Sequence, residues 1–406
     1  MFFFCCVTGK NIGNIVFLDI SAPLRDDGSF RQQLDEDHHS GRSILEEIPR
    51  LDMIKAFPND PMHLFDLGWM KKFVFLWTEG PLKNRFQASE IRRINIHLEV
   101  ISKFVPREFA RKCRSLNFRH SFKANEYAMW NAYIGPVLLM SADIHKRCKR
   151  LYNHFVVFHV VIRLLSYKKY CYAYSDYAQK LIGILIEEGI LIYGQKFGTP
   201  NTHAALHIIA NVSDFGPLPF FSAYPFENFL QLLKKLLRKS DKPLQQVVKR
   251  VYEITKIVSG KQAIEKSTSR KTFGKQHLNG PIPASLSNAK QYESMELGSW
   301  YLCPKSEGDR CVYIEIDRKI IVVDVENIVA SPQGFFIVGK RFTQLDNIFE
   351  YPLASKNLDI FKVSKPGKAL EHWPLSAIQY KAFKFPLTAT SQTEFVVLPL
   401  VMEPHD

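Results

Sequence analysis

The chain has 406 residues, 46% of them hydrophobic, so it can bury a sizeable core and form more than one domain. Its 54 Lys and Arg outnumber its 40 Asp and Glu, and the net charge of +14 favours a polyanionic partner, nucleic acid before a membrane surface. Charged residues interrupt every apolar stretch short of the ~18 residues of a bilayer span. Seven scattered cysteines indicate a reducing, intracellular compartment, and secretion is not expected.

The first fifty residues predict a loop-rich lead-in, followed by helices. A strand-like run at 15–20, IVFLDI, precedes a polar segment without apolar periodicity. From about residue 51 the apolar spacing becomes helical, as in ASEIRRINIHLEVISKFVP, with Ser89 as a candidate cap. Thr199 before Pro200 is a typical helix start. Further helices are predicted at 69–78, 124–140, 151–165, 176–192, 200–212 and 225–239.

The last third of the chain changes character. Between about 256 and 294 the sequence is polar and basic, which is typical of a solvated linker. Beyond it, β-branched or aromatic runs at 312–316, 320–325, 335–339 and 394–400 are separated by turn residues, including DRK at 317–319. The sequence therefore predicts a mainly α fold with a small β domain (α+β). The expected division is a lead-in at 1–50, a helical domain at 51–258, a basic linker at 259–294 and a β-rich domain at 295–406.

Two histidines form the first candidate site. A helix through TPNTHAALHIIAN would present His203 and His207 from one face, as zinc ligands often are. Packing or solvation of the pair is the alternative, and spacing alone leaves it open. A zinc hydrolase of the HExxH type needs a glutamate after the first histidine, but Ala204 stands there. That enzyme class therefore stays only a remote alternative.

The segment YPFENFLQLLKKLLRK (224–239) predicts an amphipathic helix. Glu227 near its start either suits the positive end of the helix dipole or serves as a metal-binding carboxylate. Thirteen Lys or Arg against four Asp or Glu between 225 and 275 form either a track for a DNA backbone or a solvated face. The stripe expected to be buried comprises Phe226, Phe229, Leu230, Leu233, Leu236 and Leu237.

Four segments carry a family resemblance: NDPMHLFDLGWMKK (59–72), HSFKANEYAMWNAYIGPVLL (120–139), NTHAALHIIANVSDFGPL (201–218) and SAYPFENFLQLLKKLLRKSDKPLQQ (222–246). In this order and spacing they resemble the later part of CACTA-type (En/Spm-related) DNA transposases and transposase-derived proteins, from about residue 9 to 255. The resemblance implies an RNase H-like DDE core, in which three carboxylates hold two divalent metals, Mg²⁺ or Mn²⁺, for chemistry on DNA. It implies that Glu227 is the last of these acids and that the helical region is an insertion ahead of it.

The resemblance also implies a structural Zn²⁺ site made of a C-x-x-C and a pair of histidines. His203 and His207 match the pair, whereas Cys5 and Cys6 are adjacent and a phenylalanine stands where the first cysteine belongs. We therefore expect zinc affinity to be weak unless Cys5 or Cys6 completes the site.

The strands that would carry the first two catalytic Asp residues lie upstream of residue 1 in the family pattern. Asp60 and Asp66 match a motif at the start of the insertion, which places them away from Glu227, in turn and helix-cap roles. We expect a truncated or domesticated, nuclear, catalytically inactive DNA-binding protein. Alternatives are a fragment of an active DDE transposase, a protein-interaction module or homo-oligomer, and a remnant without function. Non-specific backbone contacts are expected from Lys234, Lys235, Arg238, Lys239 and Lys242.

Overall fold

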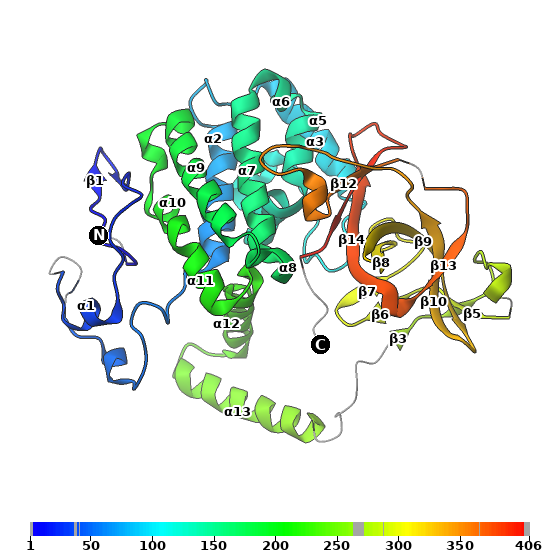
Figure 1. Cartoon of the computed structure of the whole chain (residues 1–406). Helices are drawn as coiled ribbons and strands as arrows, with labels where there is room; N and C mark the ends of the chain where they lie inside the picture. Colours follow the sequence, from blue (N-terminus) through cyan, green and yellow to red (C-terminus); the bar gives the residue numbers. More distant parts are fainter. Residues whose placement is uncertain are drawn as a thin grey trace.

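The structure is a computed structural model, described over residues 3–35, 39, 41–262, 272–286, 288–364 and 366–401. Figure 1 shows a body of helices beside a C-terminal region of strands, with the N-terminal lead-in along the opposite side of the body. The fold is therefore α+β, as predicted. Among the described residues, none of the helices combines the length and the apolar character needed to cross a membrane.

The lead-in is irregular but anchored to the helical body. The predicted strand at 15–20 is reduced to β2 (Ile15–Val16), which pairs antiparallel with β1 (Lys10–Asn11). A short helix, α1 (Asp27–Arg31), follows. Phe17 is buried and its backbone N–H donates to the carbonyl oxygen of Gly198 at 2.7 Å. The lead-in is therefore held by residues almost two hundred positions further along the chain.

Helix α7 (Lys149–Ser166) lies at the centre of the body, and fifteen of its eighteen residues are buried. It is apolar on all sides, so neighbouring helices can surround it. Trp69, Trp77 and Trp130 are buried. The surrounding elements are the π-helix η2 (Met62–Met70), α2 (Lys71–Thr78), α3 (Ala88–Ile101), α4 (Ala124–Met129), the π-helix η4 (Trp130–Ile134), α5 (Gly135–Ser141), α6 (Ile144–Arg147), α8 (Lys168–Cys171) and α9 (Ser175–Tyr193).

Two predicted helix starts have different outcomes. Thr199 caps α10 (Pro200–Ala204), because its side chain accepts a hydrogen bond from the backbone N–H of Thr202. Ser89 does not cap α3: the N-cap is Gln87, whose backbone N–H donates to the Glu90 carboxylate at 2.7 Å. A glutamate in the third helical position thus fixes the start of α3 two residues earlier than predicted.

The β region forms one ten-stranded sheet and one three-stranded sheet. Asp317 and Arg318, at the predicted turn between β8 and β9, have φ of 48° and 62°, as in a two-residue hairpin of type I′. The strands are β3 (Thr272–Phe273), β4 (Gln276–His277), β5 (Lys290–Tyr292), β6 (Met295–Leu297), β7 (Trp300–Leu302), β8 (Cys311–Ile316), β9 (Lys319–Ser331), β10 (Gly334–Arg341), β11 (Leu345–Asp346), β12 (Phe361–Val363), β13 (Glu371–Pro374), β14 (Ile378–Pro386) and β15 (Phe395–Pro399).

The predicted linker at 259–294 is largely structured where it is described. Helix α13 (Pro243–Gln262) continues to residue 262, residues 263–271 lie outside the described residues, and β3, β4 and β5 occupy part of the rest. β5 pairs with the long strand β9, and the buried side chain of Gln291 accepts a hydrogen bond from Asn327 Nδ2 at 2.8 Å. Backbone pairing and a polar side chain together make this polar segment part of the sheet.

The β region shares its core with the helical body. Phe383 and Leu398 belong to the same buried cluster as Phe155 and Leu165 of α7. A fully buried cation, Lys381, also joins the regions: its Nζ contacts the Glu108 carboxylate at 2.6 Å and that of Asp309 at 2.5 Å. Paired and hydrogen-bonded, such a charge is tolerated in a core. The β region therefore packs directly against the helical body and is not joined to it by a linker alone.

Helices α12 (Tyr224–Leu236) and α13, with the connecting residues 237–242, form the α12–α13 arm. Figure 1 shows α12 extending away from the helical body and α13 running across the far end of α12. None of the residues of α12 is buried, so the predicted burial of the stripe containing Phe226 and Leu230 is wrong. The helix is amphipathic as predicted; Leu233 and Leu236 are half-buried, and the other members of its apolar stripe are exposed.

Candidate metal centre and basic arm

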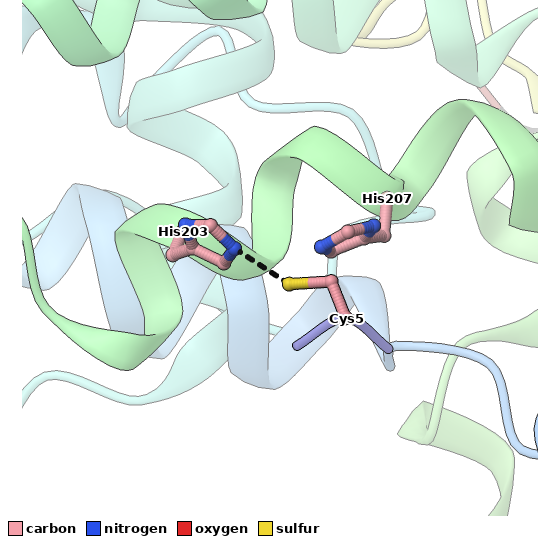
Figure 2. Close-up of side chains that lie close together, drawn as sticks. All are labelled: Cys5, His203 and His207. Atoms are coloured by element: carbon pink, nitrogen blue, oxygen red, sulfur yellow. Dashed lines mark hydrogen bonds between the residues drawn. The ribbon is translucent and has the colours of Figure 1, made fainter. Parts of the chain in front are cut away.

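Three potential metal ligands meet where the lead-in touches the helical body. Cys5 lies on the lead-in, His203 in α10, and His207 in the 3₁₀ turn η6 (Ala205–His207). Their ligand atoms all lie within 4.8 Å of one another, and Cys5 Sγ is 3.1 Å from His203 Nε2. Figure 2 shows the sulfur and one nitrogen of each ring converging on one point. The sequence predicted these three residues as ligands, and the fold brings them together across almost two hundred residues.

The helix that carries the histidines is not continuous. A 3₁₀ turn separates α10 from α11 (Ile208–Phe215), so the predicted single helix at 200–212 is wrong. The ring centroids of His203 and His207 are nevertheless 5.5 Å apart. Phe4 stacks on His207, and Phe17 packs against His203, both from the lead-in. These aromatic rings pack against the imidazoles, and no sequence pattern predicted these contacts.

The surroundings of the three groups favour neutral imidazoles. Burial lowers the pKa of His203, and burial together with the neighbouring His203 lowers the pKa of His207 to about 4. Burial raises the pKa of the Cys5 thiol. Neutral imidazole is the form that binds a metal, whereas the thiol must lose its proton to do so. The histidines are thus in the neutral form that binds a metal, and the cysteine would release a proton when a metal binds.

The donor set fits zinc in kind, and one pair of ligand atoms, Cys5 Sγ and His203 Nε2, lies 3.1 Å apart, near the spacing of zinc ligands. Two histidine nitrogens and one cysteine sulfur are typical zinc ligands, and tetrahedral zinc holds its ligand atoms roughly 3.3–3.6 Å apart. Cys6, the fourth predicted ligand, is exposed and lies outside this group. Asp19 is close enough to raise the pKa values of both His203 and Cys5 by its charge. The described residues thus supply three ligands and a nearby carboxylate.

Glu227 lies near the start of α12, beside Asp60, which precedes η2, and His63, which belongs to η2. His63 Nε2 is 3.4 Å from Glu227 Oε1, and His63 Nδ1 contacts the Asp60 carboxylate. Asp60 also accepts the backbone N–H of Ala223 at 2.7 Å. The expectation that Asp60 lies away from Glu227 is therefore wrong, although its helix-cap role is confirmed by the N–H groups of Met62 and His63 that it accepts. Only a long-range contact brings Asp60 here, so no local pattern could have predicted it.

A second carboxylate, Asp66, lies behind this group in the core. It accepts hydrogen bonds from Asn131 Nδ2 at 2.6 Å and from the Tyr224 hydroxyl at 2.8 Å. Burial raises the pKa of Asp66 to about 7, which the two hydrogen bonds offset only in part. Asp66 and Asn131 come from the two π-helices η2 and η4, whose wide turns often occur at functional sites.

The residues predicted to contact DNA are all on the arm and all exposed. Lys234 and Lys235 belong to α12, and the other three follow in the connecting residues. Nine Lys or Arg stand against three Asp or Glu between 225 and 262. The side chain of Gln246 holds the connection, because it donates to the carbonyl oxygen of Lys239 and accepts from the backbone N–H of Arg238. The arm therefore presents concentrated positive charge in a defined shape.

Comparison with known proteins gives one match. Residues 276–400 match the model of a domain family of unknown function, DUF8592. The match covers most of the β region and none of the helical body. No curated protein and no solved structure matches the chain.

Proposed function

We propose that this chain is a transposase-derived protein that binds the DNA backbone through the cations of the α12–α13 arm. The observation that carries the proposal is the exposure of Lys234, Lys235, Arg238, Lys239 and Lys242 on one protruding element with few acidic neighbours. Side chains of this kind neutralise phosphates without reading bases. The proposed binding is therefore tight at low salt and independent of DNA sequence, and its place is the nucleus.

In this proposal the metal centre has a structural role. Cys5, His203 and His207 would hold one zinc ion, with Asp19 or water in the fourth position. The ion would clamp the lead-in onto α10 and η6, next to the base of the arm. It would supply cross-linking, because its ligands come from the lead-in and from the helical body.

The resemblance to CACTA-type transposases makes Glu227 the remnant of an RNase H-like DDE site. Two-metal cleavage of DNA needs several carboxylates that share two ions. Here the carboxylates of Asp60 and Glu227 contact opposite nitrogens of His63, so an imidazole stands between them. We propose that the chain by itself does not cleave DNA. Because Asp60 lies in the same group as Glu227, a fragment of an active Mg²⁺- or Mn²⁺-dependent enzyme is the second candidate.

DNA binding is tested by the salt dependence of affinity. Each cation that meets a phosphate releases about 0.9 counterion, so replacing Lys234, Lys235, Arg238 and Lys239 by glutamine should reduce the slope of log K against log[salt] by up to about 3.6. Fluorescence anisotropy with a short duplex measures both slopes. The matched control replaces four other exposed cations, Lys83, Lys103, Arg111 and Lys112, and should leave the slope unchanged. An unaltered slope in the arm variant would refute the proposal.

Cleavage is tested by plasmid nicking in Mg²⁺ or Mn²⁺, with the wild type and Glu227→Gln side by side. Equal background in both is expected. Metal-dependent nicking that disappears in Glu227→Gln would establish the second candidate instead.

A further inference from the structure

Helix α12 begins at a residue that cannot cap it. The N-cap position is held by Ala223, whose side chain has no hydrogen-bond acceptor. The backbone N–H of Ala223 donates instead to Asp60 Oδ1 at 2.7 Å, across 163 positions of the chain. Asp60 also accepts the N–H groups of Met62 and His63 at the start of η2. One carboxylate therefore meets the N-termini of two helices, η2 in the body and α12 in the arm.

A second contact joins the start of α12 to the core of the body. The hydroxyl of Tyr224, the first residue of α12, donates to Asp66 Oδ2 at 2.8 Å. Asp66 is itself held by Asn131, whose Nδ2 donates to Asp66 Oδ1 at 2.6 Å, and both of these residues are buried. Ala223 and Tyr224, the base of the arm, are thus attached to a packed part of the body.

The length and exposure of α12 make these two contacts important for its stability. The helix has 13 residues, and none of them is buried. Isolated helices shorter than about 12–15 residues are marginal in water, because most helices in proteins are stabilised by packing of one face. An acceptor for the first N–H groups and a negative charge near the first turn both favour the helical state. The contacts at the base therefore determine how much of the time α12 is helical.

We propose that Asp60 and Asp66 are positioning residues for the α12–α13 arm, which act through Ala223 and Tyr224 to keep α12 helical and attached to the body. The inference rests on the proposed function, because it gives both acids a role in DNA binding. A helical α12 holds Lys234 and Lys235 at a fixed spacing. Less conformational entropy is then lost when the arm binds a phosphate backbone.

Hydrogen exchange without DNA tests the attachment. Tyr224→Phe removes only the hydroxyl that reaches Asp66, and Asp60→Ala removes the acceptor of Ala223. Each variant should accelerate amide exchange in α12 by roughly fivefold, the typical effect of losing a helix cap, and leave α7 unchanged. Asp60→Asn keeps a side-chain oxygen for Ala223 and should restore most of the protection. The matched control is Tyr252→Phe, at an exposed tyrosine of α13, which should exchange like the wild type.

DNA binding tests the positioning role. Tyr224→Phe should weaken binding to a short duplex by roughly fivefold at one salt concentration. The slope of log K against log[salt] should stay that of the wild type, because the same cations meet the phosphates. Exchange in α12 that is unchanged in both Tyr224→Phe and Asp60→Ala would overturn the inference, and so would accelerated exchange with unchanged affinity.

The four-cation glutamine variant separates this inference from DNA binding by the arm. A wild-type slope in that variant would refute the proposed function and leave the exchange result for Asp60 and Tyr224 intact. A reduced slope, together with wild-type affinity in Tyr224→Phe, would support DNA binding by the arm and refute the positioning role.

Discussion

Helix α7 and helix α12 are both rich in apolar residues, yet fifteen residues of α7 are buried and none of α12 is. The difference lies in their surroundings. α7 is enclosed by helices and by β14 and β15, which complete one continuous core. The arm projects beyond that core (Figure 1). An apolar stripe therefore predicts that a surface will be covered, but not whether the same chain covers it.

The cations of the two regions differ in the same way. Lys381 is fully buried between Glu108 and Asp309 and joins the β region to the body. Lys234 and Lys235 are exposed on the arm. The net charge of +14 counts both kinds equally. Only the structure separates the cations that stabilise the fold from those that can meet a phosphate.

The largest expected contrast is in stability. Phe155→Ala in α7 should lower the free energy of unfolding by about 3–5 kcal/mol, because it leaves a cavity in a fully packed site. Phe226→Ala in α12 should change it by less than about 0.5 kcal/mol, because that side chain is exposed. Urea unfolding of the wild type and of each single variant gives both values. Equal losses would mean that the arm is part of the core.

The buried acid of the body predicts a pH effect. Asp66 has a folded-state pKa of about 7, above the 3.8 of an unperturbed carboxyl, so the folded state binds the proton more tightly. Its favourable contribution is complete below about pH 3.8 and is lost as the pH rises to about 7, a change of about 4 kcal/mol. Asp66→Asn removes this titration. Relative to the wild type, the variant should gain stability between pH 4 and 8.

Thermal or urea unfolding at several pH values, with Asp176→Asn as the comparison at an exposed carboxylate, measures the effect of Asp66. A difference between wild type and Asp66→Asn that does not vary with pH would show that the carboxyl of Asp66 is ionised throughout.

The metal centre predicts a smaller, ligand-dependent effect. With zinc at a hundredfold excess over its dissociation constant, the folded state should gain about 2.7 kcal/mol. His203→Ala with His207→Ala should abolish both this gain and the bound zinc, whereas the exposed His120→Ala should keep them. Metal analysis and melting temperatures with and without chelator measure the two quantities. Stoichiometric zinc in the double-histidine variant would contradict the assignment.

Local patterns predicted most of the fold. Helical periodicity located α3, α7 and α9, and the β-branched runs located β8, β9 and β10. The β14 strand was missed because Lys381 and Lys384 interrupt its apolar run. α13 was not among the predicted helices, although most of it lies in the predicted helical domain at 51–258. β14 pairs with β8, a long-range partner that a local window does not contain.

The candidate site shows the same difference between local sequence patterns and long-range contacts. The spacing of His203 and His207 and the nearness of Cys5 to the family motif were visible in the sequence. The contact between Asp60, His63 and Glu227 was not, because it joins residues more than 160 positions apart. A site whose residues are close in the sequence or match a family motif can be predicted, whereas a site whose residues meet only in the fold requires the structure.

Lysine footprinting tests the central claim, that the arm contacts DNA while the body supports it. Acetylation with and without a duplex, followed by mass spectrometry, compares Lys234, Lys235, Lys239 and Lys242 with the exposed Lys83 of the body. The account predicts that DNA protects the four arm lysines and leaves Lys83 equally reactive. Arm lysines that stay reactive in the complex, or protection confined to the body, would contradict it.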